Sequence, residues 1–157
     1  MRLAEALAER ADAQKRLEQL KARACASARF QEGEEPSEDS LALLTEAEEV
    51  LGRLEELIRR INRTNASSEL EPSLTITDAI ARRDALRMRR RFVADVADAA
   101  SGQGQGHFGM RQLRSELRQV TALDVASLRR RVDDLAREHR ELDTRIQQAN
   151  WEVDLVE

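Results

Sequence analysis

The sequence predicts a mainly all-α protein, in which long helices pack antiparallel as a bundle with coiled-coil-like seams, and one segment fits a short two-stranded β-hairpin. Charged residues make up 36% of the chain and aromatic residues only 3%, a composition typical of long helices. The chain has only 2 prolines and 6 glycines to interrupt helices. An apolar seam with a residue every three or four positions runs through Val125, Leu128, Val132, Leu135, His139, Leu142, Ile146, Ala149 and Val153.

The first helix is expected at about residues 2–29. Gly33 suits the position after a helix, and Pro36 cannot continue one. The expected inner side comprises Leu3, Ala6, Leu7, Ala13, Leu17, Leu20 and Ala24, with Gln14 on the same side.

The second helix is expected at about residues 37–65, with Ser37 as N-cap and Glu38 and Asp39 in the first turn. Its apolar face is three positions wide per heptad, which favours contact with two partners rather than one. That face comprises Leu43, Leu44, Ala47, Val50, Leu51, Leu54, Leu57, Ile58 and Ile61, and continues to Thr64 and Asn65.

The helical pattern stops at residues 67–76, where alternating apolar residues indicate one arm of a hairpin. A third helix is expected at about 78–100, capped by Thr75 or Thr77. The composition of residues 101–109 predicts a flexible loop. Residues 110–123 fit either a strand or a short helix, and we favour extended structure that pairs with residues 70–76.

The last helix is expected at about residues 125–151, with Asp124 as its cap. Three of the expected helices are each about 40 Å long at the usual rise per residue. Residues 1–157 are therefore expected to form a single helical domain. Its seams are longer than one compact bundle needs, which indicates contact with a second subunit.

Charge is spread unevenly along a chain whose formal net charge is −4. Residues 32–56 are acidic, with Arg53 as their only base, and residues 82–91 are basic, with Asp84 as their only acid. These blocks fit pairing within the fold, pairing between subunits, or two solvated faces. The acidic total speaks against nucleic acid as a partner.

The start of the chain and its single cysteine, Cys25, indicate the compartment. The first residues carry Glu5 and no continuous apolar run, so they do not resemble a secretory signal. No segment approaches ~18 apolar residues without charge, which speaks against a helix that spans a membrane. We expect a cytoplasmic protein.

Six polar residues are candidates for a polar core or for setting helix register. Asn65 continues the seam of Leu44, Leu51 and Ile58, where a buried Asn would fix register and partner number; equally, Asn65 could simply end the helix. The candidates are Gln14, Asn62, Asn65, Asp78, Arg82 and His139. Asp78 and Arg82 lie one turn apart, and an inward Arg82 would need acceptors such as Asn62, Asn65 and Gln14.

The residues indicate no catalytic or metal chemistry. The di-iron motif of helical bundles places Glu three residues before His, and Ala136 stands there relative to His139. No nucleophile lies at a suggestive spacing from a base, and the glycines at 102, 104 and 106 do not follow a clear strand. We therefore expect no catalytic residues, no metal and no cofactor.

The chain resembles the septicolysin-like proteins, a family of small and largely uncharacterised bacterial helical proteins. The resemblance is collinear over nearly the whole chain. It is carried by residues 3–7 and 10–12, Gln31–Pro36, Ile61–Asn65, 74–86 with the core Ala81-Arg82-Arg83-Asp84, and Ile146–Trp151. The family name implies a membrane-active cytolysin, and it implies no particular mechanism or cofactor.

Three functions follow as hypotheses. The first is a homo-oligomeric structural or scaffold protein, open to a further protein partner and without catalysis. The second is the cytolysin that the resemblance implies; against it, the polar faces of the helices are mixed in charge rather than basic. The third is a small-ligand or metal site in a polar pocket around Asn62, Asn65 and Arg82.

If Asn65 fixes register, its replacement by leucine should raise stability and scramble the oligomeric state, because the polar group would no longer select one alignment. Light scattering coupled to size exclusion would measure the mass of the Asn65→Leu variant. An unchanged oligomeric state would rule out the register role.

Overall fold

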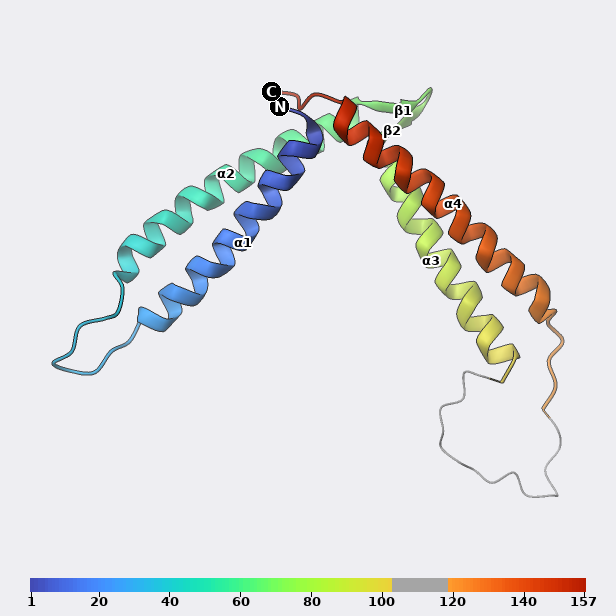
Figure 1. The fold of residues 1–157 in the computed structure, drawn as a ribbon, viewed down its shortest axis with the longest axis horizontal. Coiled ribbons are helices and arrows are strands. Elements are labelled where there is room, and N and C mark those ends of the chain that lie inside the picture. The colour runs from blue at the N-terminus through green and yellow to red at the C-terminus, as the bar shows by residue number, and fades with distance from the viewer. Residues whose placement is uncertain (103–118) are drawn as a thin grey trace, which may run out of the picture. The chain divides into compact units, whose positions relative to one another are not determined.

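The computed structural model describes residues 1–102 and 119–157, which form two compact units. The first unit comprises Met1–Thr77 with Ile146–Glu157, and the second comprises Asp78–Arg145. The described elements are α1 (Leu3–Ser27), α2 (Ser40–Ser67), β1 (Glu69–Glu71), β2 (Leu74–Thr75), α3 (Ile76–Ala100) and α4 (Val125–Glu152) (Figure 1). The predicted mainly helical class with a short hairpin is confirmed.

In the first unit, α1 and α2 run antiparallel and side by side (Figure 1). The inward positions of each helix alternate three and four residues apart, the spacing that keeps one row of side chains facing a partner helix. On α1 this row is Leu3, Ala6, Arg10, Ala13, Leu17, Leu20, Ala24 and Ser27. On α2 it is Leu43, Ala47, Val50, Leu54, Leu57, Ile61 and Thr64.

Ion pairs at the edges of this seam mark its register. Arg23 Nε donates to Glu38 Oε1 at 3.0 Å, and Arg16 Nε donates to Glu46 Oε1 at 2.9 Å. Arg53 pairs with Glu9 further along. Exposed pairs of this kind add little stability, so their main effect is on alignment. Two acids of the block 32–56, Glu38 and Glu46, thus pair with arginines of α1 within the first unit.

A backbone clasp joins the two ends of the chain. Leu3 N–H donates to the carbonyl of Val153 at 2.9 Å, and Leu155 N–H donates to that of Met1 at 2.9 Å. The Arg2 guanidinium lies 3.1 Å from the Asp154 carboxylate. Because Leu3 and Leu155 are buried, the clasp also closes the end of the hydrophobic seam.

Thr64 ties α2 to the C-terminal segment. Its buried hydroxyl donates to the Arg60 carbonyl at 2.8 Å and accepts from Val156 N–H at 3.0 Å. Arg60 Nε in turn donates to the Val156 carbonyl at 3.0 Å. The buried hydroxyl therefore has both an acceptor and a donor partner, so it is not left unpaired in the interior.

The two strands of the hairpin are closer to each other in the sequence than predicted. Strands β1 and β2 pair antiparallel with each other, and the two-residue turn Pro72-Ser73 joins them. Pro72 has its φ fixed by the ring, and Ser73 adopts a left-handed φ of 67°, so the chain reverses within two residues. The arm predicted at residues 70–76 thus pairs locally. Most of its expected partner, residues 110–123, lies outside the described residues.

Residues 103–118, which include most of the predicted loop 101–109 and of the ambiguous segment 110–123, lie outside the described residues. Residues 119–124 carry neither strand nor helix.

The helix boundaries correct one predicted cap and confirm another. Asp39, not Ser37, caps α2: its Oδ1 accepts from the N–H groups of Leu41 and Ala42 at 2.9 and 3.3 Å. At α4 the predicted cap is present, since Asp124 accepts from the N–H and the hydroxyl of Ser127. The third helix begins at Ile76, so Thr77 lies inside it and does not cap it.

In the second unit, α3 and α4 are joined by ion pairs that run in antiparallel order. Arg83 Nη1 lies 3.2 Å from Asp143 Oδ1, and Arg129 Nη2 lies 2.6 Å from Asp98 Oδ1. Between these pairs the buried side chains are Leu86, Ala97, Leu135 and Leu142. Eight of the nine positions predicted for the seam of the last helix lie in α4 and none of them is exposed, while Val153 follows the end of the helix.

Replacement of Leu155 by alanine should lower the free energy of unfolding by about 2–4 kcal/mol, because it opens a cavity beneath the terminal clasp. Val156→Ala is the matched control: its side chain is 44% exposed, so the change should be within about 0.5 kcal/mol. Urea denaturation followed by circular dichroism measures both. Equal effects of the two variants would show that the clasp does not support the core.

Candidate protein-interaction surface

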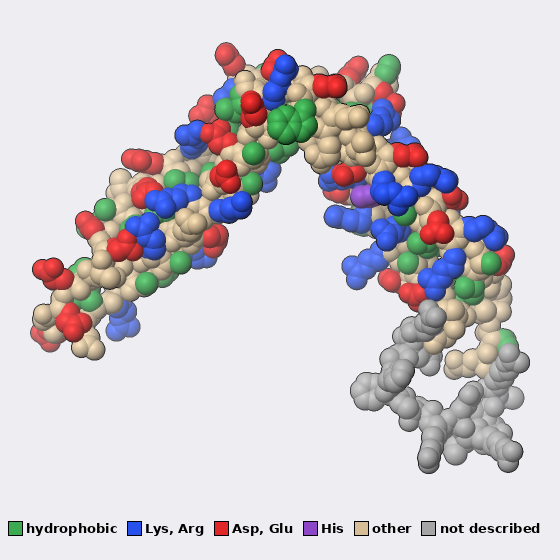
Figure 2. Space-filling model, in the orientation of Figure 1, with side chains coloured by type: hydrophobic (Ala, Val, Ile, Leu, Met, Phe, Trp, Pro, Cys, Tyr) green, Lys and Arg blue, Asp and Glu red, His purple; other side chains and the backbone are tan. Residues whose placement is uncertain are grey.

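Helix α2 carries a second apolar row beside the one that faces α1. Leu44, Leu51, Ile58 and Asn65 recur every seven residues, which places them on one side of the helix, two turns apart. Leu44 is 55% exposed and Leu51 is 40% exposed, while Ile58 and Asn65 are half-buried. We call these four residues the outer row of α2. Figure 2 shows hydrophobic side chains reaching the surface among charged ones.

A shallow groove of about 430 Å³ lies along the outer row, and a glycine forms part of its floor. It is lined by Glu48, Leu51, Gly52, Leu54, Glu55 and Ile58. A Cβ at Gly52 would meet nothing within 4 Å, so no neighbour among residues 1–102 and 119–157 requires glycine there. Glycine inside a helix is unfavourable by ~1 kcal/mol relative to alanine. Gly52 therefore lowers the stability of α2, and no contact within the described residues explains why glycine is there.

Exposed charges beside the outer row divide by sign along α2. Glu48 lies next to its N-terminal part, Glu55 lies at its middle, and Arg59 and Arg63 lie next to its C-terminal part. One end of the surface is thus acidic and the other basic. This polarity limits which charge pattern a partner can present.

The structure decides between the two predictions for Asn65. Helix α2 continues past it to Ser67, and Ser68 N–H caps the Thr64 carbonyl at 2.9 Å. Asn65 therefore does not end the helix, and it lies on the outer row as the seam prediction required. Its role in register stays a prediction.

The polar residues predicted around Asn65 do not form an interior pocket. Asn62 and Arg82 are exposed, and so is Gln14, because the inward row of α1 passes through Arg10, Ala13 and Leu17 instead. Since α1 and α2 run antiparallel and Arg16 pairs with Glu46, Gln14 lies about 25–30 Å from Asn65 along the helices.

On α3 the structure assigns the inward position to Arg83 rather than Arg82. Asp78 and Arg82 are exposed, whereas Arg83 is half-buried and bonds to Asp84 and Asp143. The inward residues Ile76, Ala79, Arg83 and Leu86 are spaced by three and four positions. This spacing could have predicted that Arg83 faces inward, but the prediction did not include a charged residue in the row. Arg82 instead lines a groove of about 170 Å³ with Leu86, Glu138, Glu141, Leu142 and Arg145.

His139 is half-buried on the seam of α4, the place expected for a spacer. Within residues 1–102 and 119–157, no three His, Cys, Asp or Glu side chains gather in a way that could hold a metal ion. No helix among those residues is long and apolar enough to cross a membrane.

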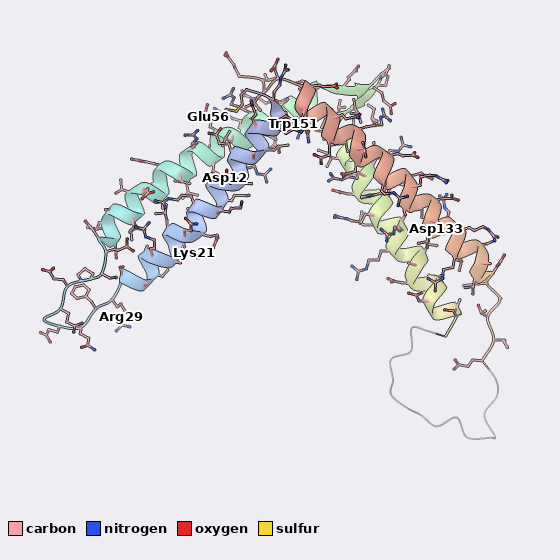
Figure 3. The ribbon with its side chains drawn as sticks, in the orientation of Figure 1. Asp12, Lys21, Arg29, Glu56, Asp133 and Trp151 are labelled. Atoms are coloured by element: carbon pink, nitrogen blue, oxygen red, sulfur yellow. The ribbon has the colours of Figure 1, made fainter. Side chains whose placement is uncertain are left out.

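Two further features of the first unit were considered as sites. A groove of about 350 Å³ beside the Arg53–Glu9 pair is lined by Met1, Glu9, Arg53, Glu56, Leu57 and Arg60. Trp151 is 65% exposed near the end of α4 (Figure 3). Neither combines an apolar surface with an organised set of polar groups as the outer row does.

Hydrogen bonds lower the pKa of two carboxyl groups, one in an ion pair and one at a helix cap. The Arg23 guanidinium donates to Glu38 and holds the pKa of that carboxyl below its ordinary value. The Ser127 hydroxyl and backbone N–H lower the pKa of Asp124 in the same way. Both groups hold helix ends or helix pairs, so their acidity reports on structure rather than on reaction chemistry.

The fold defines a mainly helical protein of antiparallel helix pairs, and a partly exposed apolar row lies on α2. The chain belongs to DUF6847, a family of unknown function, which matches residues 10–155. It is similar over 99% of both chains, with 40% identity and a TM-score of 0.88, to a crystal structure of a functionally unknown conserved protein from Corynebacterium diphtheriae. Among proteins with curated descriptions, none matches. The resemblance to septicolysin-like proteins stays a prediction.

The ion pair between Arg23 and Glu38 should make stability depend on pH. Because the folded-state pKa of Glu38 is lowered, its contribution is present above the unfolded-state pKa and is lost as pH falls through the folded-state pKa. Glu38→Gln should therefore destabilise the protein near pH 7 and have progressively less effect in acid.

Thermal unfolding of the wild type and Glu38→Gln between pH 3 and 7 measures this convergence. Glu32→Gln, an exposed change in the neighbouring loop, is the control and should leave the pH dependence unchanged. A constant difference between wild type and Glu38→Gln across the range would contradict the assignment.

Proposed function

We propose that this protein is a homo-oligomeric structural or interaction protein that acts by binding and carries out no catalysis. The observation that carries the proposal is the outer row of α2. Leu44 and Leu51 expose large apolar side chains on one side of α2, and apolar surface that is contiguous and rimmed by polar residues marks interaction sites. In this protein the row follows the heptad spacing by which helices pair.

The width of the apolar face of α2 supports the same proposal. Helix α1 covers the row that contains Leu54, Leu57 and Ile61, and the outer row lies beside it. A helix with two adjacent rows suits contact with two neighbours, as in coiled-coil bundles. One neighbour is present within the first unit, and the second is proposed to come from another subunit.

The proposal predicts a discrete assembly. Light scattering behind a sizing column should give a multiple of the 17.8 kDa chain mass at micromolar concentration. Leu51→Glu should weaken the assembly at least tenfold, because it introduces a charge into an apolar contact; tenfold corresponds to about 1.4 kcal/mol.

Leu41→Glu is the matched control, since Leu41 is 75% exposed in the first turn of α2 and is not part of the outer row. It should leave the mass unchanged. A wild-type protein that stays monomeric at tens of micromolar would overturn the proposal.

A further inference from the structure

We infer that the outer row of α2 pairs with the same row of a second copy of this chain in antiparallel orientation, about a two-fold axis near Leu54 and Glu55. The inference rests on the proposed function and deepens it by naming the partner, the surface and the register. Three features of α2 carry it: the distribution of charge, the spacing of the apolar residues and the hollow at Gly52.

The charge pattern selects a second copy in antiparallel orientation. Glu48 flanks the N-terminal part of the row, Glu55 lies at its middle, and Arg59 and Arg63 flank the C-terminal part. In an antiparallel pair, the acidic end of one copy faces the basic end of the other. A parallel pair would place Glu48 beside Glu48 and Arg59 beside Arg59, and like charges at such positions disfavour pairing.

The spacing of the row sets the register. With the axis between Leu54 and Glu55, Leu51 lies opposite Ile58 of the second copy, and Leu44 lies opposite Asn65 of the second copy. Two central layers are then apolar, and the polar Asn65 lies at the outer end, where water reaches it. The same register brings Glu48 of one copy near Arg59 and Arg63 of the other.

The hollow at Gly52 gains a reason in this arrangement. Ile58 of the second copy is level with Leu51 and Gly52, and the groove of about 430 Å³ offers room for its side chain. Glycine lets a neighbouring helix approach closely because no Cβ stands in the way. The seam with α1 is undisturbed, since the outer row contains none of its residues.

Cysteine cross-linking tests the orientation directly. In a Cys25→Ser background, which removes the single exposed thiol, one cysteine is placed at a time on α2 and the protein is oxidised with copper phenanthroline. Glu55→Cys lies next to the inferred axis, so two copies should form a disulfide, which needs Cα atoms within about 7 Å. Leu44→Cys should not link to itself, because the two copies of residue 44 would lie about 30 Å apart.

A mixture of two variants and a control complete the design. Leu44→Cys mixed with Asn65→Cys should give a linked heterodimer. Glu56→Cys is the matched control, because it is exposed at the same level of α2 but borders the groove shared with Glu9 and Met1 rather than the outer row. Far-UV circular dichroism verifies that each variant is as helical as the wild type.

Each outcome decides the inference. Efficient linking at residue 55, with at least tenfold less at residues 44 and 56, supports it. Self-linking at both 44 and 55 indicates a parallel pair, and equal linking at 55 and 56 indicates random collision; either result overturns the inference. Absence of linking at 55 in a protein that light scattering shows to be oligomeric overturns this interface and leaves the proposed function standing. Absence of linking in a monomeric protein overturns both.

Discussion

The structure depends on rows of side chains that recur at alternating intervals of three and four residues. In the first unit, such a row on α1 meets such a row on α2, and small residues such as Ala6 and Ala13 let the two helices lie close together. The helices contain few large aromatic side chains, so stability comes from many modest apolar contacts along the length of the pair. The ion pairs, caps and terminal clasp all act on helices that this seam has already aligned.

Several polar groups on these rows are satisfied by specific partners, although the buried Nε of Arg10 has none in the part of the chain that the structure describes. The Thr64 hydroxyl bonds to Arg60 and Val156, and the buried Ser27 hydroxyl lies 3.1 Å from that of Ser37. In the second unit the half-buried Arg83 bonds to two aspartates. Because an unpaired polar group in the interior is costly, each of these positions admits few alternative alignments. The polar members of the rows thus restrict register, while the apolar members supply most of the packing.

Helix α2 differs from α1 because it carries two adjacent rows, and α1 covers one of them. The charge polarity along its outer row and the open glycine beside Leu51 are difficult to explain for a chain that acts alone. They fit a surface that recognises its own copy. A family of unknown function and a structural neighbour of unknown function leave the surface itself as the most direct guide to what this protein does.

The sequence by itself determined the four helices, the apolar row of α4 and the cap at Asp124, because helical periodicity and capping are local properties. It also indicated that α2 has a face too wide for one partner. Only the tertiary structure decided which arginine of Arg82-Arg83 turns inward, that Gln14 is exposed, that the hairpin closes on itself and that α2 continues past Asn65. Those outcomes depend on which helix lies opposite and in what register, and neighbouring residues only 100° apart on a helix cannot be separated until the partner helix is in place.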